Sequence, residues 1–129
     1  MTEDVKAFMK NAILPVFLGN SREARRLMSR LFGRFGIVSL FCDRQRSLSD
    51  LFSLGSRFFR LCESTEPDII KEQLLAIASK YSDYVMILIP SGEEFSSAVS
   101  ICSRELEARF IISSTDKLLC CPPIADLSA

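Results

Sequence analysis

Polar residues gather where three apolar runs of the sequence end, and their types suit the binding of a small polar molecule. They are Gly19, Asn20, Ser21, Asp43, Ser91, Gly92 and Glu93. Hydroxyl, amide and carboxylate groups can orient a ligand. The free N–H groups at the start of a helix can bind an anion. These residues are therefore our candidate substrate-binding set.

The same inventory argues against a catalytic centre carried by this chain alone. The sequence contains no histidine, which removes the usual general base and excludes Ser-His and Cys-His nucleophilic catalysis. Five cysteines without a C-x-x-C motif leave a zinc site with almost no ligands. The adjacent Cys120 and Cys121 are either a redox pair or ordinary thiols, and we favour ordinary thiols.

The turn after the first apolar run lacks the glycines of a dinucleotide site. The stretch GNSREA has only the first glycine of the pattern G-x-G-x-x-G, so a pyrophosphate would meet the side chains of Asn20 and Arg22. We therefore expect Gly19 to allow the turn and Asn20 to cap the following helix, with Glu23 completing a capping box. Asp43 lies near the spacing of a ribose-binding acid, but an aspartate that closes a strand is more often a turn residue.

Five runs have the length and composition of strands, and they determine where the polar turns lie. They are Val16–Leu18, Ile37–Cys42, Arg57–Leu61, Tyr84–Ile89 and Arg109–Ser113. The run YVMILI does not alternate, which is typical of a parallel strand covered on both faces. The run Arg57–Leu61 is more polar and is predicted at an edge. Pro15 should be tolerable only as the leading residue of the first strand.

Helical periodicity separates these runs. The first helix has one apolar face, formed by Ala24, Leu27, Met28, Leu31, Phe32 and Phe35, and Gly36 should end it. Residues 47–54 predict a short helix, and Pro67 predicts the first turn of another, which buries Ile70, Leu74, Ile77, Ala78 and Tyr81. Ser91 and Glu94 predict a capping box before a helix with Phe95, Ala98, Val99 and Cys102 inside.

Strands alternating with helices predict a doubly wound, Rossmann-like α/β fold. We expect a five-stranded parallel sheet of order 3-2-1-4-5 with helices on both faces. Ligands of such sheets lie at the carboxyl ends of the strands, where strand order reverses, which is where the candidate turns fall. A length of 129 residues suits one domain, 1–129. We expect 1–13 to be an extension and 116–129 to begin a linker to a following domain.

Charge and hydropathy exclude some partners. Sixteen basic residues balance sixteen acidic ones, so the chain offers no electrostatic case for nucleic acid or an anionic membrane. The longest apolar run, Val85–Ile89, is too short to span a bilayer, and we expect a cytoplasmic protein.

The first helix carries five arginines (Arg22, Arg25, Arg26, Arg30 and Arg34) against Glu23. We interpret them as a solvated outer face, with a partner-domain surface as the next alternative.

The order of these motifs resembles a known family. The segment PVFLGNSREARRLMSRLFGRFGIVSLFCD resembles the opening of ATP-grasp carboxylate–amine ligases, with a proline, an apolar strand, an L-G turn and an amphipathic helix. SRFFRLCE is similar to the third strand of the family, VMILIPSGEE to its fourth strand and following turn, and LEARFIISS to its fifth. The resemblance covers residues 14–115, and Asn20 departs from it because many relatives have a second glycine there.

The resemblance implies a domain that precedes the ATP-grasp core and offers its crevice to a small carboxylate or amine substrate. ATP and Mg²⁺ would be held by the domains that follow, which are the implied partner. The isolated chain would bind no cofactor and catalyse nothing, and the 19–21 and 91–93 loops would face the ligase active site. Two alternatives stay open: a freestanding module that binds a nucleotide or small anion, and a structural domain that forms an oligomer such as a homodimer.

Overall fold

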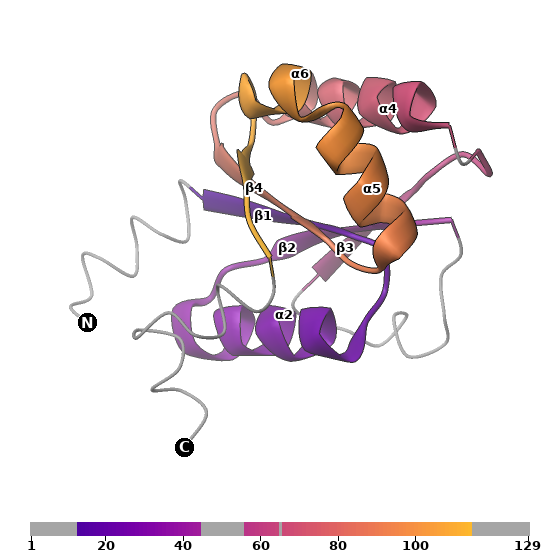
Figure 1. The fold of residues 1–129 in the computed structure, drawn as a ribbon. Helices are drawn as coiled ribbons and strands as arrows, with labels where there is room; N and C mark the ends of the chain where they lie inside the picture. The colour runs from indigo at the N-terminus through magenta and orange to yellow at the C-terminus, as the bar shows by residue number, and fades with distance from the viewer. Residues whose placement is uncertain (1–12, 45–55, 65, 115–129) are drawn as a thin grey trace.

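Five parallel strands form one sheet of order β3-β2-β1-β4-β5 in the computed structural model (Figure 1). The strands are β1 (Ile13–Leu18), β2 (Ser39–Asp43), β3 (Ser56–Arg60), β4 (Val85–Pro90) and β5 (Ile111–Ile112). The structure describes residues 13–44, 56–64 and 66–114. The doubly wound α/β class, the strand order and the edge position of β3 are confirmed.

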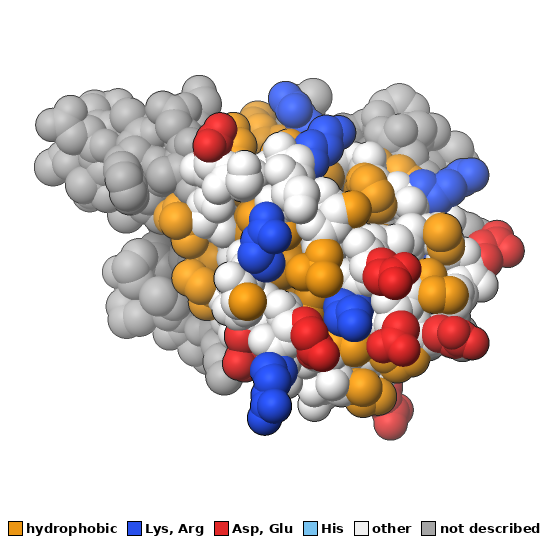
Figure 2. All heavy atoms as spheres, turned by 90° about the horizontal axis from the view of Figure 1, so that it is seen from above, with side chains coloured by type: hydrophobic (Ala, Val, Ile, Leu, Met, Phe, Trp, Pro, Cys, Tyr) orange, Lys and Arg blue, Asp and Glu red, His pale blue; other side chains and the backbone are white. Residues whose placement is uncertain are grey.

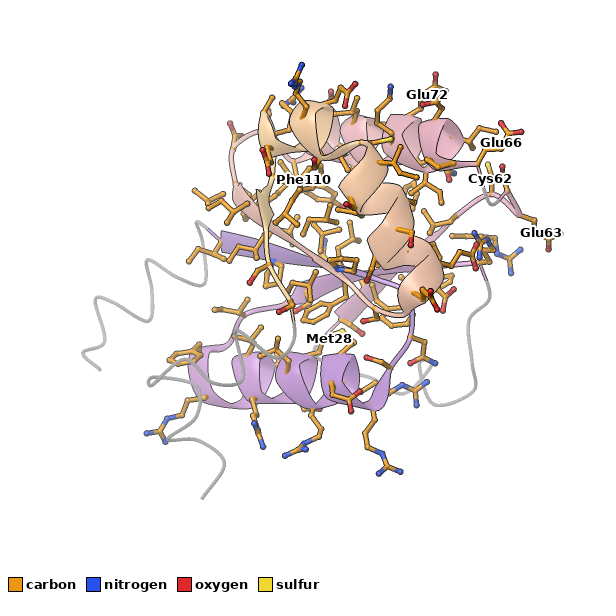
Figure 3. The ribbon with its side chains drawn as sticks, in the orientation of Figure 1. Met28, Cys62, Glu63, Glu66, Glu72 and Phe110 are labelled. Carbon is orange, nitrogen blue, oxygen red and sulfur yellow. The ribbon has the colours of Figure 1, made fainter. Side chains whose placement is uncertain are left out.

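Helices cover both faces of the sheet. Helix α2 (Arg22–Phe35) lies on one face, and α4 (Pro67–Lys80), α5 (Glu93–Ile101) and α6 (Ser103–Glu107) lie on the other (Figure 1). Two separate apolar cores result, one on each side of the sheet. Met28, labelled in Figure 3, belongs to the α2 core, and Phe110 belongs to the core under α4–α6. Such a division follows from side chains that alternate between the two faces of each strand.

Strand β1 is longer than predicted, and Pro15 lies inside it. The N–H of Gly19 donates to the carbonyl of Cys42 in β2, at 2.8 Å. Because backbone groups alternate sides along a strand, the nitrogen of Pro15 also faces β2. The ladder to β2 begins only at Val16, opposite Leu40. The missing N–H of Pro15 therefore falls before that ladder starts, which is why proline is accepted in this central strand.

Helix α2 ends as predicted but is capped by a different residue. Gly36 has a φ of 69°, and its N–H donates to the carbonyls of Leu31 and Phe32, as a left-handed C-terminal glycine does. The N-cap is Ser21, whose Oγ accepts from the N–H of Ala24 at 3.0 Å. The prediction of Asn20 as the cap was wrong, since its Oδ1 accepts instead from Nε of Arg25.

The second predicted capping box was also wrong. The N-cap of α5 is Gly92, which makes no side-chain cap bond. Ser91 and Glu94 instead make contacts across the edge of the sheet, described below. The sequence also missed the break at Cys102 that separates α5 from α6. Three predictions fall on residues that the structure does not describe. They are the helix over 47–54, residues 1–12 of the extension 1–13, and the linker over 116–129.

The predicted apolar faces are largely confirmed. All the inner residues of α2 are buried except Phe32, which is 37% exposed. Those of α4 are buried apart from the partly exposed Tyr81, and those of α5 are all buried, including Cys102. Full burial of one large aliphatic or aromatic side chain stabilises a fold by about 1.5–3 kcal/mol. Within the described ranges, no helix is both long and apolar enough to cross a membrane.

Candidate functional site

The ends of β1, β2 and β4 meet at the carboxyl edge of the sheet. The N–H of Ser91 donates to the carbonyl of Leu18 at 2.7 Å, and the N–H of Gly19 donates to the carbonyl of Cys42 at 2.8 Å. These two bonds continue the strand ladders into the turns. They bring the turn at 19–21, the turn at 91–93 and the end of β2 together where strand order reverses, and we call this meeting point the crevice because ligands of doubly wound sheets bind at that position.

Gly19 is required at the base of this crevice. Its φ of 92° lies in the region that favours glycine. A Cβ atom on Gly19 would lie 2.7 Å from Cδ2 of Phe95 and 2.8 Å from the carbonyl oxygen of Ser91. The β1 turn therefore touches the start of α5 so closely that no side chain fits between them. Gly19 is a packing and turn residue as well as a crevice residue.

Two serines join the turns directly. The Ser21 hydroxyl donates to the Ser91 hydroxyl at 3.2 Å, across 70 residues of sequence. Ser91 is buried, and Ser21 is half-buried. The Ser21 oxygen also accepts from the N–H of Ala24. The pair thus presents two hydroxyl groups at one point of the crevice.

Arg44 is a crevice residue that the sequence did not identify. Its guanidinium pairs with the carboxylate of Glu94 and donates to the carbonyl of Ser64 at 2.8 Å. It also lies 4.8 Å from the ring centre of Phe95, within the range of a cation–π contact. Arg44 thus links the end of β2 to the beginning of α5 and to the loop after β3.

The two acidic candidates and Gly92 have local roles. Oδ1 of Asp43 accepts from the N–H of Arg44 at 2.7 Å, which fixes the backbone from which Arg44 extends. Gly92 has a φ of 84° and begins α5. Glu93 is exposed in the first turn of α5. Glu94, one residue later, is the acid that reaches into the crevice.

The thiol beside the crevice is not a nucleophile. Cys42 is fully buried, and burial, with a smaller contribution from the negative charge of Asp43, raises the pKa of its thiol far above the ordinary value. A thiol that stays protonated is inert. Among residues 13–44, 56–64 and 66–114, no group of three or more cysteine, aspartate or glutamate side chains is placed to hold a metal ion.

Comparison with protein-family models finds no match for this chain, and comparison with curated proteins finds none either. What the site can do therefore has to be argued from its geometry. Among the described residues, the crevice holds the guanidinium of Arg44, the carboxylates of Asp43 and Glu94, and the hydroxyls of Ser21 and Ser91. That set can bind and orient a small anionic or polar group.

Proposed function

We propose that this chain is the N-terminal, substrate-side domain of an ATP-dependent carboxylate–amine ligase. The observation that carries the proposal is the meeting of the 19–21 and 91–93 turns at one crevice, held by the bond from Ser91 to Leu18. Both turns belong to the segments that resemble the family. The chain then positions a substrate, and a following or neighbouring ATP-grasp domain supplies the reaction.

Arg44 is the residue that suits a substrate carboxylate. It already binds a carboxylate, that of Glu94, and guanidinium groups match carboxylates with two parallel hydrogen bonds. Its Nε atom is buried and has no hydrogen-bond partner within the described part of the chain. A buried donor without a partner costs free energy, and a ligand oxygen would satisfy it. A small carboxylate that displaces Glu94 would pair with the guanidinium of Arg44.

The chain's own residues bind and orient in this scheme. ATP and Mg²⁺ would be held by the ATP-grasp domain, where ATP supplies the activation of the carboxylate. Because the sequence has no histidine and the carboxylates of Asp43 and Glu94 are already bonded to Arg44, we expect no activity from the isolated chain. The proposed partners are a small carboxylate or amine and the ATP-grasp domain, with no nucleic acid among them. The proposed location is the cytoplasm.

The test begins with the transcript. A reading frame for an ATP-grasp domain after codon 129 or in a neighbouring gene supports the proposal, and its product should consume ATP only when carboxylate and amine are both present. Arg44→Gln should then raise KM for the carboxylate at least tenfold with little change in kcat, since it removes binding shared by ground and transition states. Arg109→Gln is the matched control and should change neither constant.

Two results would contradict the proposal. One is a genome with no ATP-grasp frame beside this one. The other is a thermal shift of the isolated chain with adenine nucleotides and none with carboxylates, which would favour a freestanding nucleotide-binding module. Ligand at a hundredfold excess over Kd stabilises by about 2.7 kcal/mol, so such a shift is easily measured.

A further inference from the structure

Helix α2 carries a row of like charges on its outer side. Arg22, Arg26, Arg30 and Arg34 follow one another at four-residue intervals, which is about 6 Å along a helix axis. Figure 3 shows side chains with nitrogen tips extending from α2 away from the sheet. We call these four residues the arginine row. A hollow of about 610 Å³ over the beginning of α2 is lined by several of these arginines and by Ser29.

The one acid on α2, Glu23, forms no ion pair with the arginine row. None of its four members forms an ion pair with a described residue. Like charges four residues apart destabilise a helix. With Arg25 and Glu23 the helix has a net charge of +4, so the rest of this neutral chain carries −4. A helix that retains this repulsion suits a negatively charged partner.

Gly33 and Phe32 lie beside the arginine row, and they also favour a partner that binds to this side of α2. A Cβ atom on Gly33 would meet no atom of the described residues within 4 Å, so none of those residues requires a glycine at this position of the helix, where it is unfavourable relative to alanine. Its absent side chain lets another backbone approach α2 closely. Phe32 is one of the few exposed large apolar side chains in the described residues, and it would be covered by the same contact.

The opposite side of the domain is acidic. Residues 63–107 hold nine acidic and three basic side chains, and Figure 2 shows acidic side chains spread over the face seen from above. Glu63, Glu66 and Glu72 lie there, across the sheet from α2 (Figure 3). This distribution would repel a long polyanion that wraps the molecule, because such a ligand meets both faces. It favours a compact acidic surface that touches α2 alone.

We propose that the outer face of α2 is a docking surface for an acidic helix of another protein. Carboxylates placed every four residues on such a helix repeat at the same 6 Å as the arginine row. Gly33 allows close helix–helix approach, and Phe32 provides an apolar contact at the edge. This inference is independent of the ligase proposal, because the arginine row, Gly33 and Phe32 make none of the crevice contacts, although Asn20 and Ser21 also line the hollow over the start of α2.

The test uses the full chain and two synthetic helical peptides. Both peptides have capped ends, an alanine–glutamine background and four glutamates, placed four residues apart in the first peptide and consecutively in the second. In calorimetry at about 50 mM salt, the first should bind at least tenfold more tightly than the second, and about 200 mM salt should weaken it. Replacing Arg22, Arg26 and Arg34 by glutamine should lower its affinity at least tenfold.

Controls decide whether the contact is specific. The matched variant replaces three exposed cations outside α2, Arg57, Arg104 and Arg109, by glutamine, and it should bind the first peptide as the unaltered chain does. Equal binding of the two peptides, or equal loss in the two variants, would overturn the proposal. So would tighter binding of a short oligothymidylate than of the first peptide. The proposal would also be overturned if the chain self-associates in a salt-sensitive way and the variant with Arg22, Arg26 and Arg34 replaced by glutamine does not. A second copy of the chain would then be the partner that binds α2.

Discussion

The contact between the first turn and α5 predicts an unequal response of two glycines. Gly19 and Gly92 both have positive φ values, of 92° and 84°. A Cβ atom on Gly19 would lie under 3 Å from a side-chain atom of Phe95 and a backbone oxygen of Ser91, whereas one on Gly92 would meet nothing within 4 Å. Replacing each by alanine therefore separates backbone strain from collision.

The expected magnitudes follow from these two terms. Gly92 has a φ of 84° and a ψ of 159°, a conformation found almost only in glycine that costs another residue about 1–3 kcal/mol, so Gly92→Ala should lower the free energy of unfolding by about that amount. Gly19→Ala adds overpacking to a similar backbone strain, and overpacking costs about 1–3 kcal/mol. The Ser91 oxygen cannot move freely because the N–H of the same residue is bonded to Leu18. We expect a total of about 2–6 kcal/mol for Gly19→Ala.

Chemical denaturation of the two variants and the unaltered chain measures this difference. A domain of ordinary stability has a free energy of unfolding of about 5–15 kcal/mol, so both variants should still fold. If the dependence on denaturant concentration has the same slope in all three proteins, the shift in midpoint gives the change in stability directly. Gly19→Ala must be the more damaging by at least about 1 kcal/mol. Equal effects, or a loss below about 1 kcal/mol at Gly19, would refute the close approach of the two turns.

Three further predictions concern a cap, a helix and a thiol. Ser21→Ala should cost about 1 kcal/mol in a urea titration, whereas Asn20→Ala should cost less than half of that, and the reverse order would restore Asn20 as the cap. Gly33→Ala should raise the melting temperature, with about 1 kcal/mol of stabilisation, and an unchanged or lowered value would show an unrecognised contact. Cys62 is exposed and Cys42 buried, so among the cysteines that the structure describes a thiol reagent should modify Cys62 first and Cys42 only at the rate of unfolding. The pKa of the Cys42 thiol is raised in the folded state, whereas the unfolded thiol titrates near 9.0. The contribution of Cys42 to the free energy of unfolding is therefore constant below pH 9.0 and falls above it by about 1.4 kcal/mol per pH unit. Denaturation at a series of pH values, compared with Cys42→Ala, measures this loss.

The sequence predicted the parts of the fold that depend on periodicity. The apolar spacing of α2 located its buried face, and the unbroken apolar run in β4 indicated a strand covered on both sides. Short connections and right-handed crossovers then left few strand orders to consider. The failure at Pro15 has a local cause: a proline is acceptable in a central strand when its nitrogen lies before the ladder begins, and only the register reveals that.

The meeting of the turns at 19–21 and 91–93 was predicted, but the contacts made there were not. Asn20 and Ser21 are both good capping residues, and the choice of Ser21 depends on the turn at Gly19 and on the hydroxyl of Ser91, 70 residues away. Arg44 was missed because its partners lie far along the chain, with Glu94 at a separation of 50 residues. A charged residue directly after a strand-ending aspartate was the only signal available.

We propose that the carboxyl-edge crevice receives a small carboxylate through Arg44. Amide chemical shifts of the full chain, measured during titration with small mono- and dicarboxylates at about 10 mM, test it most directly. We predict changes at Gly19–Ser21, Arg44 and Ser91–Glu94 that Arg44→Gln abolishes and Arg109→Gln leaves intact. Changes confined to the outer face of α2, or crevice changes that survive in Arg44→Gln, would contradict the claim.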